Sequence, residues 1–280
     1  MTISTPSVLH EFLESHGLRA KKQSSQNFLI DGNIIRKIVA TAQVQKGDTV
    51  LEIGPGPGAL TQELLLRGAH VVAIEKDPLL AKALHRLQTE DQRLTVIEAD
   101  VLDFSIETFF HTHLIDGGKI KVVANLPYHI TTPIISTLLP KNKYIETMTL
   151  MVQKEVALRF IASKGTKEYS SFTVYIEHFG SVKYSFTVEP TCFYPKPSVQ
   201  SAVVQFHLVD KPLVEKQEVL FTMIRSAFSK RRKMLKSSLK DLYPSKKIEL
   251  ALNSIGLNPF ARPEELSRDH FIQLHKQLIL

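Results

Sequence analysis

Residues 124–133 of this 280-residue chain read ANLPYHITTP and follow the apolar run IKVV. An amide, a proline and a tyrosine, Asn125, Pro127 and Tyr128, therefore come together where a buried strand is expected to end. Asn and Pro are ordinary turn residues, so a strand-terminating turn explains the pattern without any function. The same groups can also recognise a ligand, because an amide oxygen and a backbone carbonyl accept hydrogen bonds and an aromatic ring stacks on a base.

A glycine-rich loop, LEIGPGPGALT at 51–61, lies between a predicted strand and a predicted helix. Its glycines, Gly54, Gly56 and Gly58, permit a tight turn and let a ligand approach the backbone. Read loosely, the spacing also satisfies the NAD-binding fingerprint. An acid inside the preceding strand, Glu52, and the glycine at position 58 are instead typical of S-adenosylmethionine sites. The loop therefore favours S-adenosylmethionine, with NAD as the alternative.

Carboxylates also end the next two predicted strands. Glu75 follows the glycines by about 20 residues, where a carboxylate can accept hydrogen bonds from both ribose hydroxyls. Asp100 ends the third strand, where it could accept a hydrogen bond from the amino group of the cofactor adenine. Glu75 could instead be a surface acid before the helix that Asp77 and Pro78 open. Together, at successive strand ends of one sheet, these acids indicate a single ligand.

Apolar, β-branched runs alternate with helical patterns through the first two-thirds of the chain. We predict strands at 49–54, 70–75, 94–99, 120–125 and 146–153, with helical segments between the first three and again before the last. This alternation predicts an α/β fold, a Rossmann-like, mostly parallel sheet with helices on both faces. Two late strands, at 184–190 and 201–209, could complete the sheet. Ligands of such sheets bind at the carboxyl ends of the strands, where the glycines and acids lie.

The segment DKPLVEKQ at 210–217 reads as a linker, and only helical patterns follow it. We therefore predict a catalytic domain that binds S-adenosylmethionine at 1–209 and a small all-helical RNA-binding domain at 210–280. Gly256 is expected to end one helix of the second domain, and Ser267 is expected to cap its last helix. The first helix is expected to bury a stripe formed by Val219, Leu220, Met223, Ile224, Ala227 and Phe228.

The composition, 43% hydrophobic and 22% charged, is that of an ordinary globular protein. No apolar run approaches the roughly 18 residues of a membrane span, and the first residues lack a signal-peptide pattern, so we expect a cytoplasmic protein without membrane contact. The single cysteine, Cys192, excludes an internal disulfide. His111 and His113 have no further ligands at zinc spacing, so we expect no metal site.

Basic residues outnumber acidic ones, with a formal charge of +7, which favours a polyanionic partner. The residues concentrate in RSAFSKRRKMLKSSLK at 225–240, which contains no acid, and in a shorter cluster at 19–22. Either cluster could be a solvated helix face. Two clusters flanking a catalytic domain favour contact with RNA phosphates, and the candidate contacts are Arg225, Lys230, Arg231, Arg232 and Lys233.

Methyl transfer to an adenine amine would use the residues at 125–128. The lone pair of adenine N6 is delocalised into the ring, which makes it a poor nucleophile. Hydrogen bonds from its two N–H groups to the Asn125 side-chain oxygen and the Leu126 carbonyl would direct the lone pair toward an incoming methyl. Pro127 would fix the turn, and Tyr128 would stack on the flipped base. Catalysis would then be positioning and electrostatics without a strong base, and His129 is expected to be packed or solvent-facing.

In order and spacing, a series of segments between about residues 20 and 270 resembles the ribosomal RNA adenine N6-dimethyltransferase family, in particular its small-subunit, kasugamycin-sensitivity type. These segments are SSQNFLIDGNII, LEIGPGPGALT, AIEKDP, EADVLDF, VANLPYHITTPII, MVQKEVALR, FYPKPSVQSAVV and AFSKRRKMLKSSL. The resemblance implies that two methyl groups are transferred to each of two adjacent adenines in the 3′-terminal hairpin of 16S rRNA, with a role in ribosome biogenesis.

The resemblance also implies residue roles. Phe193, in the loop that would close over the target base, becomes the second stacking partner opposite Tyr128. Catalysis is assigned to Asn125, Leu126, Pro127, Tyr128 and Phe193. The cofactor site is assigned to Asn27, Leu29, Gly54, Glu75, Asp100 and Asn125. The implied partner is 16S rRNA in the small subunit or an assembly intermediate, and we expect a monomer.

Departures from the family pattern keep alternatives open. Ser25 stands where the family usually has glycine, and SQNF also occurs in erythromycin-resistance methylases, which dimethylate 23S rRNA. The NLPY and GPGPGALT segments favour the small-subunit enzymes. A further alternative is a ribosome-assembly or RNA-binding factor without turnover, which the intact residues 125–128 and the carboxylates at 52, 75 and 100 disfavour. An NAD-dependent dehydrogenase would need a proton-donor constellation, and the sequence offers none.

Overall fold

The computed structural model describes residues 3, 5–18, 27–113, 118–210, 214–230 and 233–279, with the backbone alone for 111–113. The chain divides into two compact units, residues 1–157 with 183–209 and residues 158–182 with 210–280. Residues 158–182 thus group with the C-terminal helices, although the sequence pattern places them before the linker. The assignment of functional domains to 1–209 and 210–280 stays a prediction, because compactness alone does not identify a functional domain.

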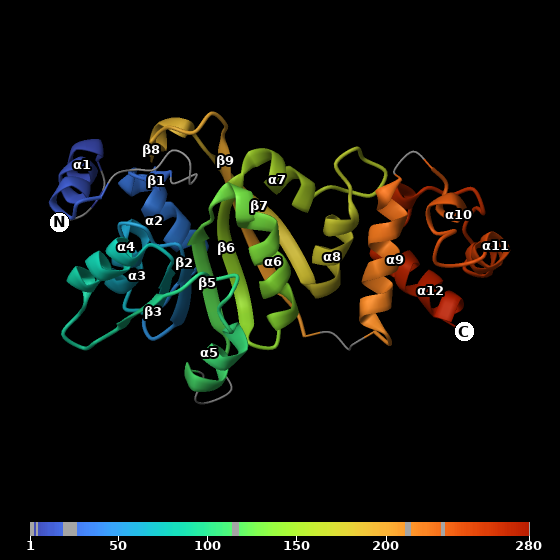
Figure 1. The fold of residues 1–280 in the computed structure, drawn as a ribbon, viewed down its shortest axis with the longest axis horizontal. Coiled ribbons are helices and arrows are strands. Elements are labelled where there is room, and N and C mark those ends of the chain that lie inside the picture. The colour runs from blue at the N-terminus through green and yellow to red at the C-terminus, as the bar shows by residue number, and fades with distance from the viewer. Residues whose placement is uncertain are drawn as a thin grey trace. The chain divides into compact units, whose positions relative to one another are not determined.

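A seven-stranded sheet with the order β4-β3-β2-β5-β6-β9-β7 forms the centre of the first compact unit (Figure 1). Its strands are β2 (Thr49–Ile53), β3 (His70–Glu75), β4 (Leu94–Glu98), β5 (Ile120–Asn125), β6 (Ile145–Gln153), β7 (Gly180–Val188) and β9 (Ser201–Leu208). Strands β2 to β6 pair in parallel, and β9 pairs antiparallel with β6. The predicted α/β fold and its strands are confirmed. The strand order reverses between β2 and β5, which is where open α/β sheets bind ligands.

Helices connect these strands and begin where the sequence provides caps. Asp31 caps α2 by accepting hydrogen bonds from the Asn33 and Ile34 amides, and Asp77 caps α4 in the same way. Pro78 occupies the first turn of α4, where a missing N–H has no consequence. The helices are α1 (Pro6–Ser15), α2 (Gly32–Thr41), α3 (Ala59–Leu66), α4 (Pro78–Leu84), α5 (Ile106–His113), α6 (Thr131–Leu138) and α7 (Lys154–Phe160). Short 3₁₀ turns are η2 (His85–Leu87), η3 (Tyr128–Ile130), η4 (Leu139–Lys141) and η5 (Pro190–Cys192).

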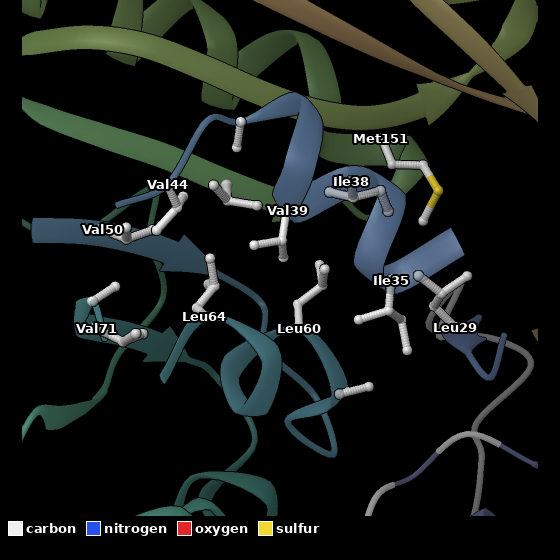
Figure 2. Close-up of a cluster of buried hydrophobic side chains, with 14 of the residues drawn as sticks. Leu29, Ile35, Ile38, Val39, Val44, Val50, Leu60, Leu64, Val71 and Met151 are labelled. Carbon is white, nitrogen blue, oxygen red and sulfur yellow. The ribbon is translucent and has the colours of Figure 1, made fainter. Parts of the chain in front are cut away.

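The core beside the glycine loop joins α2 and α3 to the sheet. Figure 2 shows Val39 of α2 pointing toward Leu60 and Leu64 of α3, with Ile38 of the same helix beside Met151 of β6. These side chains are at most 5% exposed, so each stabilises the fold by roughly 1.5–3 kcal/mol relative to an exposed side chain. The packing fixes the two helices against the ends of the strands that carry the candidate site.

A second, two-stranded sheet joins two segments that lie far apart in the sequence. Strand β1 (Phe28–Leu29) pairs antiparallel with β8 (Phe193–Tyr194), so that Phe28 lies opposite Tyr194 and Leu29 opposite Phe193. The Ile30 amide extends the contact by donating a hydrogen bond to the Cys192 carbonyl (2.9 Å). Sequence patterns alone suggest a helix lead-in for the first segment and a proline-rich loop for the second.

The N-terminal helix α1 packs on the outside of this region. Thr5 caps the helix, and its Leu9, Phe12 and Leu13 are buried against Phe28, Ile30, Leu80 and Ala83. The first residues of the chain therefore add a small hydrophobic cluster behind the glycine loop.

Apart from the first residues of β7, the regular structure described in the second compact unit is helical. It contains α8 (Ser171–Phe179), α9 (Gln217–Ser229), α10 (Leu235–Ser238), α11 (Ser245–Ser254), the 3₁₀ turn η6 (Pro263–Glu265) and α12 (Arg268–Ile279). Tyr169 links them, since its hydroxyl donates to the Leu266 carbonyl (3.0 Å) and its ring packs edge-on against Phe228.

The helix signals in this unit are confirmed with one exception. Gly256 follows α11 with a left-handed φ of +74°, and the Ser267 hydroxyl accepts a hydrogen bond from the His270 amide at the start of α12. The exception is Val219, which is 42% exposed, whereas Phe221 is buried. The buried face of α9 is centred between positions 220 and 224, which turns position 219 toward solvent.

Candidate active site at the carboxyl ends of the parallel strands

A cavity of about 660 Å³ opens at the carboxyl ends of β2, β3, β4 and β5. This volume is typical of a small-molecule or cofactor site. The cavity brings together every residue that the sequence assigned to the cofactor: Asn27, Leu29, Gly54, Glu75, Asp100 and Asn125. The residues at 126–128, predicted to act on the base, line the same cavity.

The glycine loop after β2 has a backbone conformation and close neighbours that favour residues without a side chain. Gly56 has a φ of +56°, and a side chain there would begin 3.2 Å from the Phe28 ring. Gly58 has a φ of +86°, and an added Cβ would lie 2.6 Å from the Leu87 side chain and 2.8 Å from that of Leu84, so both side chains would have to shift. Gly54 begins the loop and donates its amide to the Ile74 carbonyl (2.9 Å). Glycine is therefore required here both by backbone conformation and by packing.

Glu75 ends β3 and is tied to the glycine loop. Its two carboxylate oxygens accept hydrogen bonds from the Gly56 amide (3.0 Å) and the Asp77 amide (2.9 Å). Burial raises the pKa of Glu75, and the two amides oppose that shift. Each oxygen keeps a second lone pair, which is what the hydroxyls of a ribose would require.

Asp100, which follows β4, accepts hydrogen bonds from other residues of the chain. Its Oδ2 accepts from the Lys76 ammonium (2.6 Å) and its Oδ1 from the Leu102 amide (2.9 Å). The Lys76 hydrogen bond is the main cause that lowers the pKa of Asp100, so the carboxylate is ionised. The sequence pattern identified Asp100 but not Lys76. Lys76 follows β3 and Asp100 follows β4, and no local pattern indicates that these two residues pair.

Glu52 is the most unusual acid of the site. It lies inside β2, lines the cavity and is 1% exposed, and neither carboxylate oxygen has a hydrogen-bond partner among the described residues. Burial, reinforced by the negative charge of Glu75, raises its pKa to about 8, and the polar groups of Thr61 oppose this only in part. A buried, partnerless carboxyl that faces a cavity fits a cationic ligand such as S-adenosylmethionine.

Asn125 ends β5 with its amide group oriented by a contact across the site. Its side-chain nitrogen donates to the backbone carbonyl of Asn27 (3.2 Å), which leaves the side-chain oxygen as the free acceptor. This contact explains why the QNFL segment lies beside NLPY. It also determines which end of the amide can receive an incoming amine.

The turn after Asn125 presents a second acceptor. The Leu126 amide donates to the Met151 carbonyl (3.1 Å), and the Pro127 carbonyl is used by the Ile130 amide and the Thr131 hydroxyl. In the described part of the chain, no hydrogen bond reaches the Leu126 carbonyl. That carbonyl and the Asn125 oxygen are thus the two acceptors available at this strand end.

The aromatic residues differ in accessibility. Tyr128 is half-buried, its hydroxyl shares a hydrogen bond with that of Ser201 (2.6 Å), and burial raises its pKa, so the phenol is neutral. Phe193 is 3% exposed and packs in the core around Leu29, and it does not line the cavity. A stacking role for Phe193 would require its side chain to move, whereas the neighbouring Tyr194 is 37% exposed. His129 is exposed, as expected.

The candidate RNA contacts lie in the second compact unit. Arg225 and Lys233 are exposed, and Lys230 is paired with Asp241 at 3.6 Å. Arg231 and Arg232 lie outside the described residues, as does the cluster at 19–22, and no side chain is described for His111 and His113. Where the structure is described, it contains no group of three potential metal ligands and no helix long and apolar enough to cross a membrane.

Known sequences and structures resemble most or almost all of the chain. Ribosomal RNA small subunit methyltransferase A of Protochlamydia amoebophila (strain UWE25) is 50% identical over 278 residues, which cover 99% of this chain and 98% of that protein. The protein of the same name from Chlamydia trachomatis serovar D is 45% identical over 281 residues, which cover 98% of each.

Two crystal structures show the same architecture. A dimethyladenosine transferase from Plasmodium falciparum has a TM-score of 0.76 and 26% identity, over 89% of this chain and 98% of that one. The 23S rRNA methyltransferase ErmE has a TM-score of 0.68 and 28% identity, over 91% of this chain and all of that one. The sequence profile described as "Ribosomal RNA adenine dimethylase" matches residues 17–279. The chain therefore belongs to the ribosomal RNA adenine dimethylase family.

Proposed function

We propose that this chain is an S-adenosylmethionine-dependent methyltransferase that dimethylates N6 of adenines in small-subunit rRNA. The observation that carries the proposal is that Glu75, Asp100 and Asn125 line one cavity, in which the Asn125 side-chain nitrogen donates to the Asn27 carbonyl. The relatives that share 45–50% identity over almost their entire length are named as small-subunit methyltransferases.

The cofactor half of the cavity is formed by the carboxyl ends of β2, β3 and β4, on one side of the point where the strand order reverses. The ribose would bind at the second lone pairs of Glu75, and the adenine amine would donate to Asp100 in competition with Lys76. Asn27, Leu29 and the backbone at Gly54 would complete the wall. The cofactor supplies an electrophilic methyl group on a sulfonium, whose leaving group is a neutral thioether.

The base half of the cavity is formed by the turn after β5. The two N–H groups of the target N6 would donate hydrogen bonds to the Asn125 side-chain oxygen and the Leu126 carbonyl, so that the nitrogen becomes pyramidal and its lone pair, no longer delocalised into the ring, faces the methyl. Tyr128 would stack on the base, and Phe193 would enclose it from the other face once its loop moves. The proton of N6 leaves to solvent after transfer, so no general base is required.

The finer specificity follows from the same family comparison. We propose that the substrate is a pair of adjacent adenines in the 3′-terminal hairpin of 16S rRNA, in the small subunit or its assembly intermediate. Arg225, Lys230 and Lys233, with Arg231 and Arg232, would contact its phosphates. We propose that the enzyme acts as a monomer. A ribosomal substrate of this kind is in keeping with a cytoplasmic site of action.

Two other functions are less well supported. An enzyme of the erythromycin-resistance type would act on 23S rRNA, and ErmE shares the fold at 28% identity, well below the identity to the small-subunit relatives. A ribosome-assembly factor without turnover would not need the Asn125 contact to Asn27 or the empty acceptor at Leu126. In the proposed function, the side-chain oxygen of Asn125 and the carbonyl of Leu126 both serve to bind the target amine.

Methyl transfer to defined ribosomal substrates tests the proposal. The protein, with labelled S-adenosylmethionine, is incubated with small subunits, large subunits and free 16S rRNA, all from cells that lack this modification. We expect label in N6,N6-dimethyladenine of small-subunit rRNA, and none in large subunits. Label confined to large subunits would establish the 23S alternative, and cofactor binding without transfer to any substrate would establish the non-catalytic one.

A further inference from the structure

Ser201 is a buried polar residue at the start of a strand that continues with three apolar residues. It begins β9, is 0% exposed, and precedes Ala202, Val203 and Val204, which are equally buried. A buried hydroxyl without a hydrogen bond destabilises the folded state, so most such groups in native proteins have partners. The partner of Ser201 is the hydroxyl of Tyr128 at 2.6 Å, a short contact for two hydroxyl groups.

The sheet holds Ser201 rigidly beside the turn that carries Tyr128. Ser201 lies opposite Gln153 at the carboxyl end of β6, and Met151 of the same strand accepts the hydrogen bond of the Leu126 amide. Two adjacent strands therefore fix both ends of the contact: β6 holds the backbone of the turn, and β9 holds the tip of the tyrosine ring. A hydrogen bond at the tip fixes the direction of the ring axis, and with it the first side-chain torsion of Tyr128.

We propose that Ser201 is a positioning residue for methyl transfer: its hydrogen bond to Tyr128 orients the ring on which the target adenine stacks. This role rests on the proposed function, because it requires a base in the cavity. Stacking is sensitive to the tilt of the ring, and a ring held by a strand of the sheet is ready before the base arrives. Because burial raises the pKa of Tyr128, its hydroxyl serves as an anchor and not as a base.

The proposal predicts that the two hydroxyls act as a unit. Ser201→Ala and Tyr128→Phe should each lower kcat for small-subunit methylation by about three- to tenfold, the range expected for one hydrogen bond. The double variant should be no slower than either single variant, since each change removes the same contact. Ser201→Thr, which keeps the hydroxyl, should recover most of the activity. Affinity for S-adenosylmethionine should stay within about twofold throughout.

A matched control separates orientation from general destabilisation. Thr149 lies on β6, is 0% exposed, and its hydroxyl has no hydrogen-bond partner among the described residues. Thr149→Val therefore removes a buried hydroxyl from the same sheet without touching the ring, and kcat should not change. Thermal unfolding of all variants shows whether each is folded at the assay temperature.

The outcomes separate the two proposals. Wild-type protein that transfers no methyl to any ribosomal substrate would overturn the proposed function and this role with it. With an active wild type, additive losses in the double variant, an unchanged kcat in Ser201→Ala, or equal losses in kcat and cofactor affinity would overturn the role of Ser201 alone. Non-additive losses confined to kcat would establish it.

Discussion

The partnerless carboxyl of Glu52 predicts an unusual dependence of stability on pH. Its pKa of about 8 in the folded protein compares with 4.5 for an unburied glutamate. One pKa unit corresponds to about 1.4 kcal/mol, so ionising Glu52 in the folded protein costs up to about 5 kcal/mol relative to the unfolded chain. Glu52→Gln removes this cost, because the amide carries no charge at any pH.

The direction in which stability changes with pH follows from which state, folded or unfolded, binds the proton of Glu52. Below pH 4.5 both states hold the proton, and Glu52 has no effect on the pH dependence. Between pH 4.5 and about 8 the folded protein keeps a proton that the unfolded chain has released, so the free energy of unfolding falls as pH rises. Above about pH 8 both states are ionised and the effect levels off. The stability of Glu52→Gln relative to wild type should therefore grow from near zero at pH 4.5 to roughly 3–5 kcal/mol at pH 8.

Denaturant unfolding of the cofactor-free protein at intervals between pH 5 and 9 measures this difference. Glu98→Gln is the control, because Glu98 is exposed at the end of β4, and its curve should run parallel to that of wild type. Parallel curves for wild type and Glu52→Gln would refute the assignment of a raised pKa to this residue.

The same carboxyl links cofactor binding to proton release. A cationic ligand beside Glu52 favours its ionised form, so binding at pH 7 should release close to one proton. Calorimetric titration in buffers of different ionisation enthalpy measures that number. Glu52→Gln should release none, and equal proton release by the two proteins would exclude Glu52 as its source.

Three further perturbations address the base, the cofactor and the RNA. Asn125→Ala should lower methylation about 10²–10³-fold while cofactor affinity is kept, as for loss of one preorganised polar contact, and full activity would refute its role. Lys76→Met should bind the cationic cofactor about two- to fivefold more tightly, because Asp100 is freed and a positive charge is removed, whereas Lys76→Arg should not; weaker binding by the Met variant contradicts this competition. Reversing the charges of Arg231 and Arg232 should weaken RNA binding and flatten its dependence on salt, and an unchanged salt slope would argue against phosphate contact.

Most of the catalytic scaffold could be predicted from the sequence. The strands that became β2 to β6 are apolar runs, and the parallel arrangement brings their carboxyl ends to one edge of the sheet. For that reason the glycine loop, Glu75, Asp100 and Asn125 could be assigned to one cavity without coordinates. These are consequences of local pattern and of a general rule of sheet topology.

The contacts that orient those residues were decided by the tertiary structure. Asn125 is turned by the carbonyl of Asn27, Tyr128 by Ser201, and Asp100 is occupied by Lys76, and in each pair the partners come from different elements. Such contacts depend on how neighbouring strands and loops are placed side by side, and no local sequence pattern encodes that placement.

Burial was likewise set by the assembled fold. The sequence showed an acid in a strand at Glu52 and an aromatic in a loop at Phe193, but both are enclosed only when distant segments pack around them. The desolvation that raises the pKa of Glu52, and the β1–β8 pairing that buries Phe193, arise from that packing. The sequence by itself determined most of the groups that meet at the site. The tertiary structure determined which way each faces and how much water it meets, because orientation and desolvation are properties of the folded chain.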